Sequence, residues 1–166
     1  MKRLAIFLFA AALLAGTVTT HDSRSGLVIH APSGWHVDPD SAAFAIESFP
    51  ARKRPPQVLV PFGGARIMVA APPVKSIDEL VLRDRLTAEN GYVAQQTQLK
   101  TSQGSIAAEE IRLDRNKVIP DGHTLIHAFS VRGRIYETFL LYRGASSKSK
   151  FEKIYFEIVS TLEFPQ

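Results

Sequence analysis

The stretch HTLIHAFSVRGRIYETFLLY, residues 123–142, decides the fold. Two runs rich in aromatic and β-branched residues flank Gly133, which tolerates the positive φ of a tight turn. They predict a hairpin with strands at His123–Arg132 and Ile135–Tyr142. A connection this short leaves no room for a crossover helix. The hairpin therefore favours an antiparallel sheet over a doubly wound parallel one.

One helix is predicted before this hairpin and one after it. Ser76 and Glu79 have the spacing of a capping box, and Gly91 suits the helix end because glycine accepts a left-handed cap. Ser149 and Glu152 repeat the capping-box spacing and predict a second helix start. The apolar residues of that helix recur at helical spacing on one face that packs on the sheet: Phe151, Ile154, Tyr155, Ile158 and Leu162.

The rest of the chain reads as short strands separated by Pro and Gly turns. Along Ala65–Ala71, Ile67 and Val69 alternate with Arg66 and Met68, which predicts a strand with one face in the core. The further predicted strands are Leu27–Ala31, Ala42–Phe49, Val58–Val60, Val93–Leu99 and Ile106–Leu113. Two separated helices among hairpin-connected strands predict an α+β fold in a single domain, residues 21–166.

Residues 1–20 have the pattern of a cleaved secretory signal peptide. Lys2 and Arg3 precede an apolar run of twelve residues, Leu4–Ala15, which is shorter than the ~20 residues of a membrane-spanning helix. Cleavage after Ala15 or Gly16 suits the preference for small residues better than cleavage after Thr20. The sequence thus predicts a periplasmic or secreted protein.

Composition excludes several classes of protein. The 166 residues include no Cys, which excludes disulfides, thiolate metal sites, a Cys nucleophile and a lipid anchor on Cys. Without residues 1–20 the chain has 18 Lys and Arg against 16 Asp and Glu, a net charge of +2. This near-neutral chain gives no general attraction to nucleic acid. We expect neither a transmembrane segment nor a lipid anchor after cleavage.

The search for chemical motifs finds no nucleophile elbow, phosphate loop, dinucleotide fingerprint or calcium loop. His123 and His127 lie on one predicted strand, where four residues at ~3.3 Å each place them ~13 Å apart. One metal ion with bonds of ~2 Å cannot bind both, so they are interpreted as partly buried sheet residues. The sequence therefore predicts no metal, no cofactor and no catalytic residue.

Three carboxylates deserve consideration as functional groups. Glu109 and Glu110 are adjacent on a strand and would point to opposite faces in a regular strand, but the favoured interpretation is that a bulge turns both outward or that the strand lies at an edge. Whichever faces the core would have a raised pKa. Glu137 lies in an apolar row and either pairs with Arg132 or Arg134, the favoured interpretation, or belongs to a binding cleft.

Two further features bear on partners and packing. Arg52, Lys53 and Arg54 form the only dense basic run and precede two prolines, so this loop is the candidate contact with an acidic partner. The alternative for this loop is a solvated segment with no partner. Trp35 follows a Pro-Ser-Gly turn and is expected to plug the core at the end of the sheet.

The order of elements resembles the PsbP-like and DcrB-like domains over residues 26–164. The resemblance rests on Ala31-Pro32-Ser33-Gly34-Trp35, on Phe44-Ala45-Ile46, on the turn at Arg132-Gly133-Arg134 and on the closing Ser160-Thr161-Leu162-Glu163-Phe164. It implies an α/β/α sandwich with a central antiparallel sheet and two main helices. Members are accessory or binding proteins, among them photosystem subunits, envelope lipoproteins and a partner of a nuclear transport GTPase. The family has no shared catalytic motif, so no functional residue carries over.

Three functions follow in order of preference. The first is an exported, non-catalytic accessory or binding module whose partner is another envelope protein. The second is a carrier of a small apolar ligand in a helix–sheet pocket lined by residues such as Phe129, Phe139 and Ile158. The third is a hydrolase, which needs a nucleophile within reach of His123 or His127.

Overall fold

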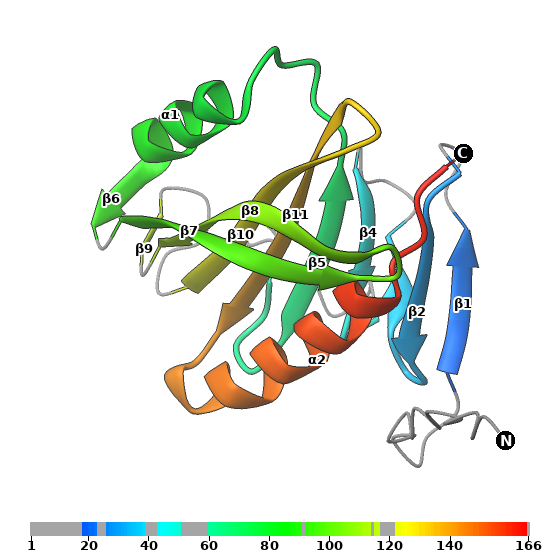
Figure 1. The fold of residues 1–166 in the computed structure, drawn as a ribbon. Coiled ribbons are helices and arrows are strands. Elements are labelled where there is room, and N and C mark those ends of the chain that lie inside the picture. The colour runs from blue at the N-terminus through cyan, green and yellow to red at the C-terminus, as the bar shows by residue number, and fades with distance from the viewer. Residues whose placement is uncertain are drawn as a thin grey trace, which may run out of the picture.

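The structure, a computed structural model, describes residues 18–22, 26–38, 43–50, 60–90, 92–113, 115–116 and 122–165. Its main sheet is antiparallel and has seven strands in the order β3-β4-β5-β11-β10-β8-β7 (Figure 1). These strands are β3 (His36–Val37), β4 (Phe44–Glu47), β5 (Ala65–Ala70), β7 (Val93–Thr101), β8 (Gly104–Leu113), β10 (Gly122–Val131) and β11 (Arg134–Arg143). The predicted α+β class with a central antiparallel sheet is confirmed.

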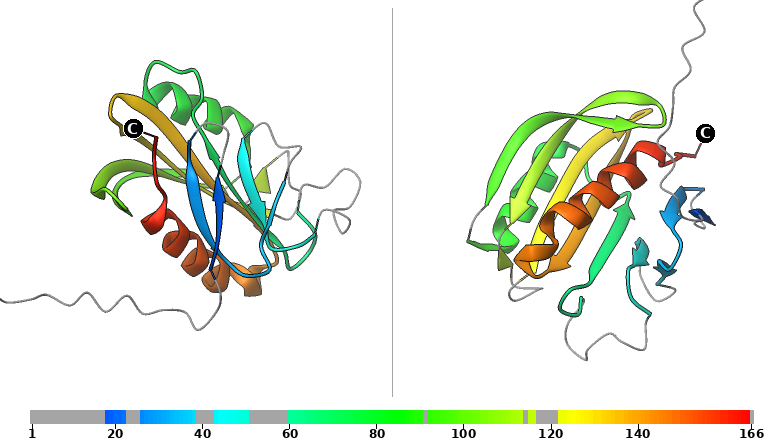
Figure 2. Two further views of the ribbon diagram at one scale, coloured as in Figure 1. Left: turned by 90° about the vertical axis from the view of Figure 1, so that its right-hand side faces the viewer. Right: turned by 90° about the horizontal axis from the view of Figure 1, so that it is seen from below.

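Two helices cover opposite faces of this sheet. Helix α1 (Ile77–Thr87) packs against β8 and β10, and helix α2 (Lys148–Thr161) packs against β7 and β11. Seen from below in Figure 2, α2 lies on the near side of the sheet and α1 behind it. The main core lies under α2 and includes Phe129, Leu140, Phe151 and Ile158, whereas the α1 face has a smaller cluster around Ile126.

The hairpin that organises the sheet forms as predicted. Strands β10 and β11 pair residue for residue, from Gly122 opposite Arg143 to Val131 opposite Arg134. The two turn residues, Arg132 and Gly133, have φ of 53° and 77°, the left-handed region in which glycine is unstrained. Such a turn matches the twist of the paired strands and fixes their register.

The two predicted capping boxes have different outcomes. At α1 the amide of Glu79 donates to Oγ of Ser76 at 3.2 Å, so Ser76 caps the helix as expected. The box at Ser149 is wrong. A 3₁₀ turn, Ala145–Ser147, runs directly into α2, so Ser149 is already helical and the cap position falls at Ser147 without a side-chain hydrogen bond.

Several short strands complete the molecule. Helix α1 ends at Thr87, earlier than predicted, because β6 (Ala88–Asn90) pairs with β9 (Arg115–Asn116). Strands β1 (Val18–Asp22) and β2 (Val28–Pro32) form a two-stranded ribbon. Strand β1 thus includes the last three residues of the predicted signal peptide.

Trp35 is buried in the main core, as expected from its turn. No helix among the described residues is both long and apolar enough to cross a membrane.

Candidate functional site

A row of four polar residues crosses the sheet beneath α2. The strand register places Gln95 of β7 opposite Glu110 of β8, then His127 of β10 and Thr138 of β11. Tyr155 of α2 lies over this row, and its hydroxyl oxygen is 2.7 Å from Nδ1 of His127 and 2.6 Å from Oγ1 of Thr138. The row is therefore a buried network that joins the helix to the sheet.

The hydrogen bonds of this network converge on Glu110. Nε2 of His127 lies 3.3 Å from Oε2 of Glu110, and a carboxylate accepts, so Nε2 carries the ring proton. Nδ1 then accepts from the Tyr155 hydroxyl, which accepts in turn from Thr138. At the other end Glu110 accepts from Nε of Arg112 at 2.8 Å. Each polar group named in this network thus has a hydrogen-bond partner.

Burial decides the protonation of this network. It lowers the pKa of His127 to about 4, against the opposing charge of Glu110, so the ring is neutral at pH 7. Burial also raises the pKa of the Tyr155 hydroxyl, which keeps it protonated. Although burial disfavours the Glu110 carboxylate, the hydrogen bond and charge of Arg112 hold the pKa of Glu110 below its usual value. The predicted raised pKa for the core-facing carboxylate is wrong for this reason.

The network offers no accessible nucleophile. The hydroxyl within reach of His127 belongs to Tyr155, whose side chain is completely buried. His123 lies on the same strand and stacks on the ring of Tyr142 at 5.1 Å between centroids. These contacts fit the interpretation of both histidines as sheet residues and give no support to the hydrolase hypothesis.

A second polar row crosses the opposite face of the same strands. Gln96, Glu109, Ala128 and Glu137 are in register on β7, β8, β10 and β11. Glu137 is fully buried beneath α1, where its Oε1 accepts from Nη2 of Arg83 at 2.5 Å. Glu137 is ion-paired as favoured, but its partner is Arg83 of α1 and not Arg132 or Arg134. Those two arginines flank the hairpin turn, whereas Glu137 lies under the helix.

Arg83 also holds a second buried carboxylate. Its Nη2 lies 3.0 Å from Oδ1 of Asp84, so one guanidinium contacts both carboxylates. Burial and the neighbouring Asp84 raise the pKa of Glu137 to about 7, and burial raises that of Asp84. This cluster therefore binds a proton close to neutral pH.

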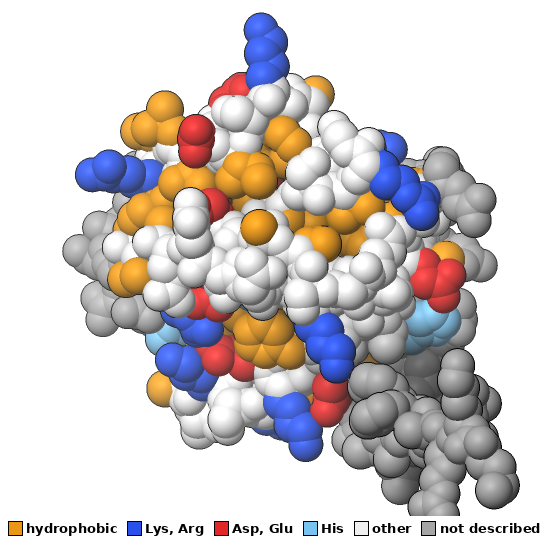
Figure 3. Space-filling view, in the orientation of Figure 1, with side chains coloured by type: hydrophobic (Ala, Val, Ile, Leu, Met, Phe, Trp, Pro, Cys, Tyr) orange, Lys and Arg blue, Asp and Glu red, His pale blue; other side chains and the backbone are white. Residues whose placement is uncertain are grey.

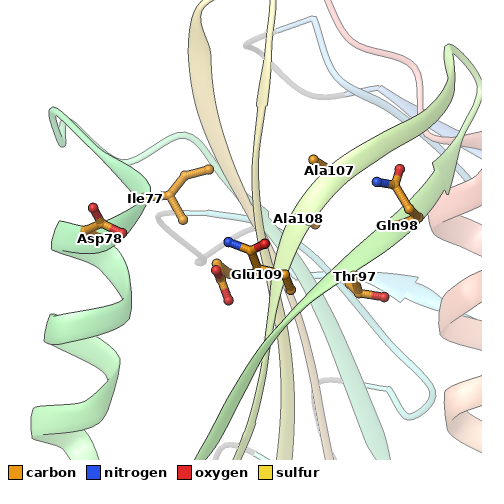
Figure 4. Close-up of a pocket in the computed structure, with 8 residues that line it drawn as sticks. Ile77, Asp78, Thr97, Gln98, Ala107, Ala108 and Glu109 are labelled. Atoms are coloured by element: carbon orange, nitrogen blue, oxygen red, sulfur yellow. The ribbon is translucent and has the colours of Figure 1, made fainter.

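Beside this cluster, an open cleft of about 470 Å³ lies between α1 and the β7–β8 hairpin. Figure 4 shows Ile77 and Asp78 of α1 on one side of it, and Glu109 with Ala107, Ala108, Thr97 and Gln98 on the other. Asp78 and Glu109 make no ion pair with any described residue. The cleft is thus acidic and open to solvent.

Glu109 and Glu110 point to opposite faces of a regular strand. The favoured interpretation, an outward bulge or an edge strand, is wrong. Strand β8 pairs without interruption on both sides, with β7 and with β10. Arg83 and Asp84 were not predicted as site residues, and Tyr155 was predicted only as part of the apolar face of α2. Nothing in the local pattern of either helix separates them from other helical polar residues, and only the register of the sheet brings them to Glu137 and His127.

The predicted apolar pocket is also wrong. Phe129 and Ile158 are buried in the core under α2, whereas Phe139 points to the α1 face. These three residues cannot line one pocket because the two faces of a sheet are separate. The predicted contact residues Arg52, Lys53 and Arg54 lie outside the described residues. Within the described residues, no three His, Asp or Glu side chains are grouped in a way that would hold a metal ion.

The architecture is similar to that of known protein structures. The chain is similar to the solution structure of cyanobacterial PsbP (CyanoP) from Synechocystis sp. PCC 6803, with a TM-score of 0.50 and 13% identity over 90% of this chain and 94% of that one. The fold is PsbP-like. A protein of unknown function, PA94 from Pseudomonas aeruginosa, is similar at a TM-score of 0.44 and 12% identity, over 91% of this chain and 99% of that one.

The PsbP-like fold confirms the resemblance drawn from the order of elements. No family model matches the chain, and no curated protein matches it. At 13% identity the likeness shows the fold alone and assigns no site residue. The function must be argued from the surfaces and networks of this chain.

Proposed function

We propose that this protein is an exported, non-catalytic accessory module that binds another protein of the cell envelope. Its fold is similar to that of cyanobacterial PsbP. The observation that carries the proposal is that the reactive side chains of the two networks have structural roles. His127, Tyr155 and Glu137 are all buried and engaged in bonds that join a helix to the sheet.

The surface offers binding chemistry instead. The cleft between α1 and the β7–β8 hairpin is open and carries Asp78 and Glu109, and α1 and β7 also carry exposed apolar side chains. Leu82, Leu86 and Val93 have exposed fractions of 58%, 71% and 53%. Figure 3, which looks onto the β7 edge, shows hydrophobic and acidic side chains together above that edge. Such mixed surfaces are typical of protein contacts.

Export is part of this proposal and rests on the pattern of residues 1–20. Cleavage after Ala15 or Gly16 would leave strand β1 whole, and the pairing of β1 with β2 therefore supports those sites over Thr20. N-terminal sequencing of the protein from its native cell should begin at Gly16 or Thr17. Recovery of an intact Met1 from the cytoplasm would overturn the export part.

Affinity purification tests the binding part. A tagged chain recovered from its native envelope should retain one partner protein reproducibly. The double variant Asp78→Lys/Glu109→Lys should fold normally, because both side chains are on the surface cleft, and should lose that partner. Turnover of a hydrolase or transferase substrate by the purified protein, abolished by His127→Gln, would show an enzyme and overturn the proposal.

A further inference from the structure

Strand β7 is one of the two edge strands of the main sheet, and β3 is the other. Strand β7 has nine residues, Val93–Thr101, and pairs only with β8 among the described strands. Its register with β8 has no shift, and most of its side chains are exposed. It contains no proline and one charge, Lys100. Long, regular edges without proline or a bulge are templates for an added strand, and proteins ordinarily protect them.

The pairing with β8 identifies which backbone groups of β7 are free. The hairpin closes on the pair Thr101 and Gly104 across a two-residue turn, so these two residues exchange hydrogen bonds. Hydrogen-bonded and non-bonded pairs alternate along an antiparallel ladder. Residues 95, 97 and 99 therefore bond to β8, and the amides and carbonyls of Ala94, Gln96 and Gln98 point out from the sheet.

On the α1 face, these free backbone groups lie beside the acidic cleft. Gln96 and Gln98 lie on the α1 face and line the cleft together with Asp78 and Glu109. A strand added to β7 would direct every second side chain into this cleft (Figure 4). A lysine or arginine there would meet two carboxylates that have no cation of their own among the described residues.

The opposite face of β7 has a different chemistry. There Gln95 donates to Glu110 at 2.9 Å and Leu99 is buried, so this face offers no free charge. Phe156 of α2 is 40% exposed on this side and its ring contacts the His127 ring edge-on. Side chains of an added strand that point this way would meet neutral and aromatic groups.

We propose that β7 binds an extended segment of a partner protein as an eighth strand, with basic side chains at alternate positions directed to Asp78 and Glu109. This inference rests on the proposed function and names the chemistry of the partner. The backbone of β7 supplies affinity, and the acidic cleft supplies specificity. A second copy of this chain fits less well because the only cation of β7, Lys100, lies beside its turn.

Hydrogen exchange on the wild-type protein tests the geometry directly. The probe is a ten-residue synthetic peptide that alternates Lys with Val or Thr, and the matched control peptide has Glu in place of Lys. Binding of the Lys peptide should slow exchange of the Ala94, Gln96 and Gln98 amides at least tenfold. The amides of residues 95 and 97 are already bonded and should change little. Protection elsewhere, or equal binding of the Glu peptide, would overturn the proposal.

Two variants at one position separate backbone pairing from side-chain contact. Gln98→Pro removes an outward amide and keeps the bonds to β8, whereas Gln98→Ala keeps the amide. We expect Gln98→Pro to weaken binding of the Lys peptide about tenfold and Gln98→Ala to leave it within about threefold. Gln96→Pro serves the same purpose if Gln98→Pro fails to fold. Unchanged binding by a folded proline variant would overturn the inference.

The experiments distinguish a failure of this inference from a failure of the proposed function. If a natural envelope partner binds the folded proline variant normally, the added strand is wrong and the binding function stands. If the purified protein turns over a substrate, the binding function itself is wrong. Sedimentation of the wild-type chain alone shows whether β7 pairs with a second copy, an outcome that would also overturn the choice of occupant.

Discussion

Glu109 and Glu110 are neighbours on β8, and their carboxylates lie on opposite faces of the sheet. Glu110 belongs to the buried network of His127 and Tyr155, whereas Glu109 lines the open cleft under α1. One residue step along a strand therefore separates a structural carboxylate from one that is free to bind. Two strands further, Thr138 and Glu137 likewise occupy the two faces of β11, but there both side chains are buried and bonded to a helix.

The Tyr155 hydroxyl should contribute to stability. Tyr155→Phe leaves Nδ1 of His127 and Oγ1 of Thr138 without this partner in a buried site. We expect the free energy of unfolding in urea to fall by about 1–3 kcal/mol. Tyr136→Phe is the matched control, since Tyr136 is a buried core residue whose hydroxyl makes no hydrogen bond with a described residue. Equal effects of the two variants would contradict a special role for the network.

His127 should make the protein less stable in acid. Its pKa is about 4 when folded and 6.5 when unfolded, so between these values the unfolded chain binds more protons. Above pH 6.5 His127 is neutral in both states and does not lower the free energy of unfolding. As the pH falls from 6.5 towards 4, the free energy of unfolding decreases because the unfolded chain takes up the proton. Relative to wild type, His127→Gln should gain on the order of 3 kcal/mol between pH 7 and 4. Chemical denaturation at several pH values measures this. A difference in unfolding free energy between His127→Gln and wild type that does not change with pH would contradict the prediction.

Glu137 should make the protein less stable as the pH rises, which is the opposite of the effect of His127. Its pKa is about 7 when folded and 4.5 in an ordinary environment, so the folded state holds the extra proton. Its contribution to stability is therefore present below pH 4.5 and is lost as the pH rises through 7. Glu137→Gln mimics the protonated group, so its stability relative to wild type should improve from pH 5 to 8. A carbon-13 titration of the Glu137 carboxyl that gives a pKa near 4.5 would refute this.

The basic run outside the described residues remains a candidate contact. We expect the triple change of Arg52, Lys53 and Arg54 to Ser to alter stability by less than about 0.5 kcal/mol, because exposed charges contribute little. The association rate with an acidic partner should fall and lose its dependence on salt. Stopped-flow measurements at two salt concentrations test this. An unchanged rate at low salt would remove this loop from the binding surface.

The sequence by itself determined the two helices, the central hairpin and the main strands, and which face of several of them is apolar. Alternation along β5 and the glycine turn at Gly133 are local signals, since side-chain direction and backbone freedom are set by neighbouring residues. The Ser76 cap and the apolar face of α2 are local in the same sense.

The tertiary structure decided the partners. Arg83 and Glu137 are 54 positions apart in the chain, and His127 and Tyr155 are 28 apart. Their contacts depend on the strand register and on where each helix lands, which no local pattern encodes. The pKa shifts follow from that burial, so the sequence could not assign them. Edge strand β7 is likewise a product of sheet order, because only the complete sheet shows which strand has one neighbour.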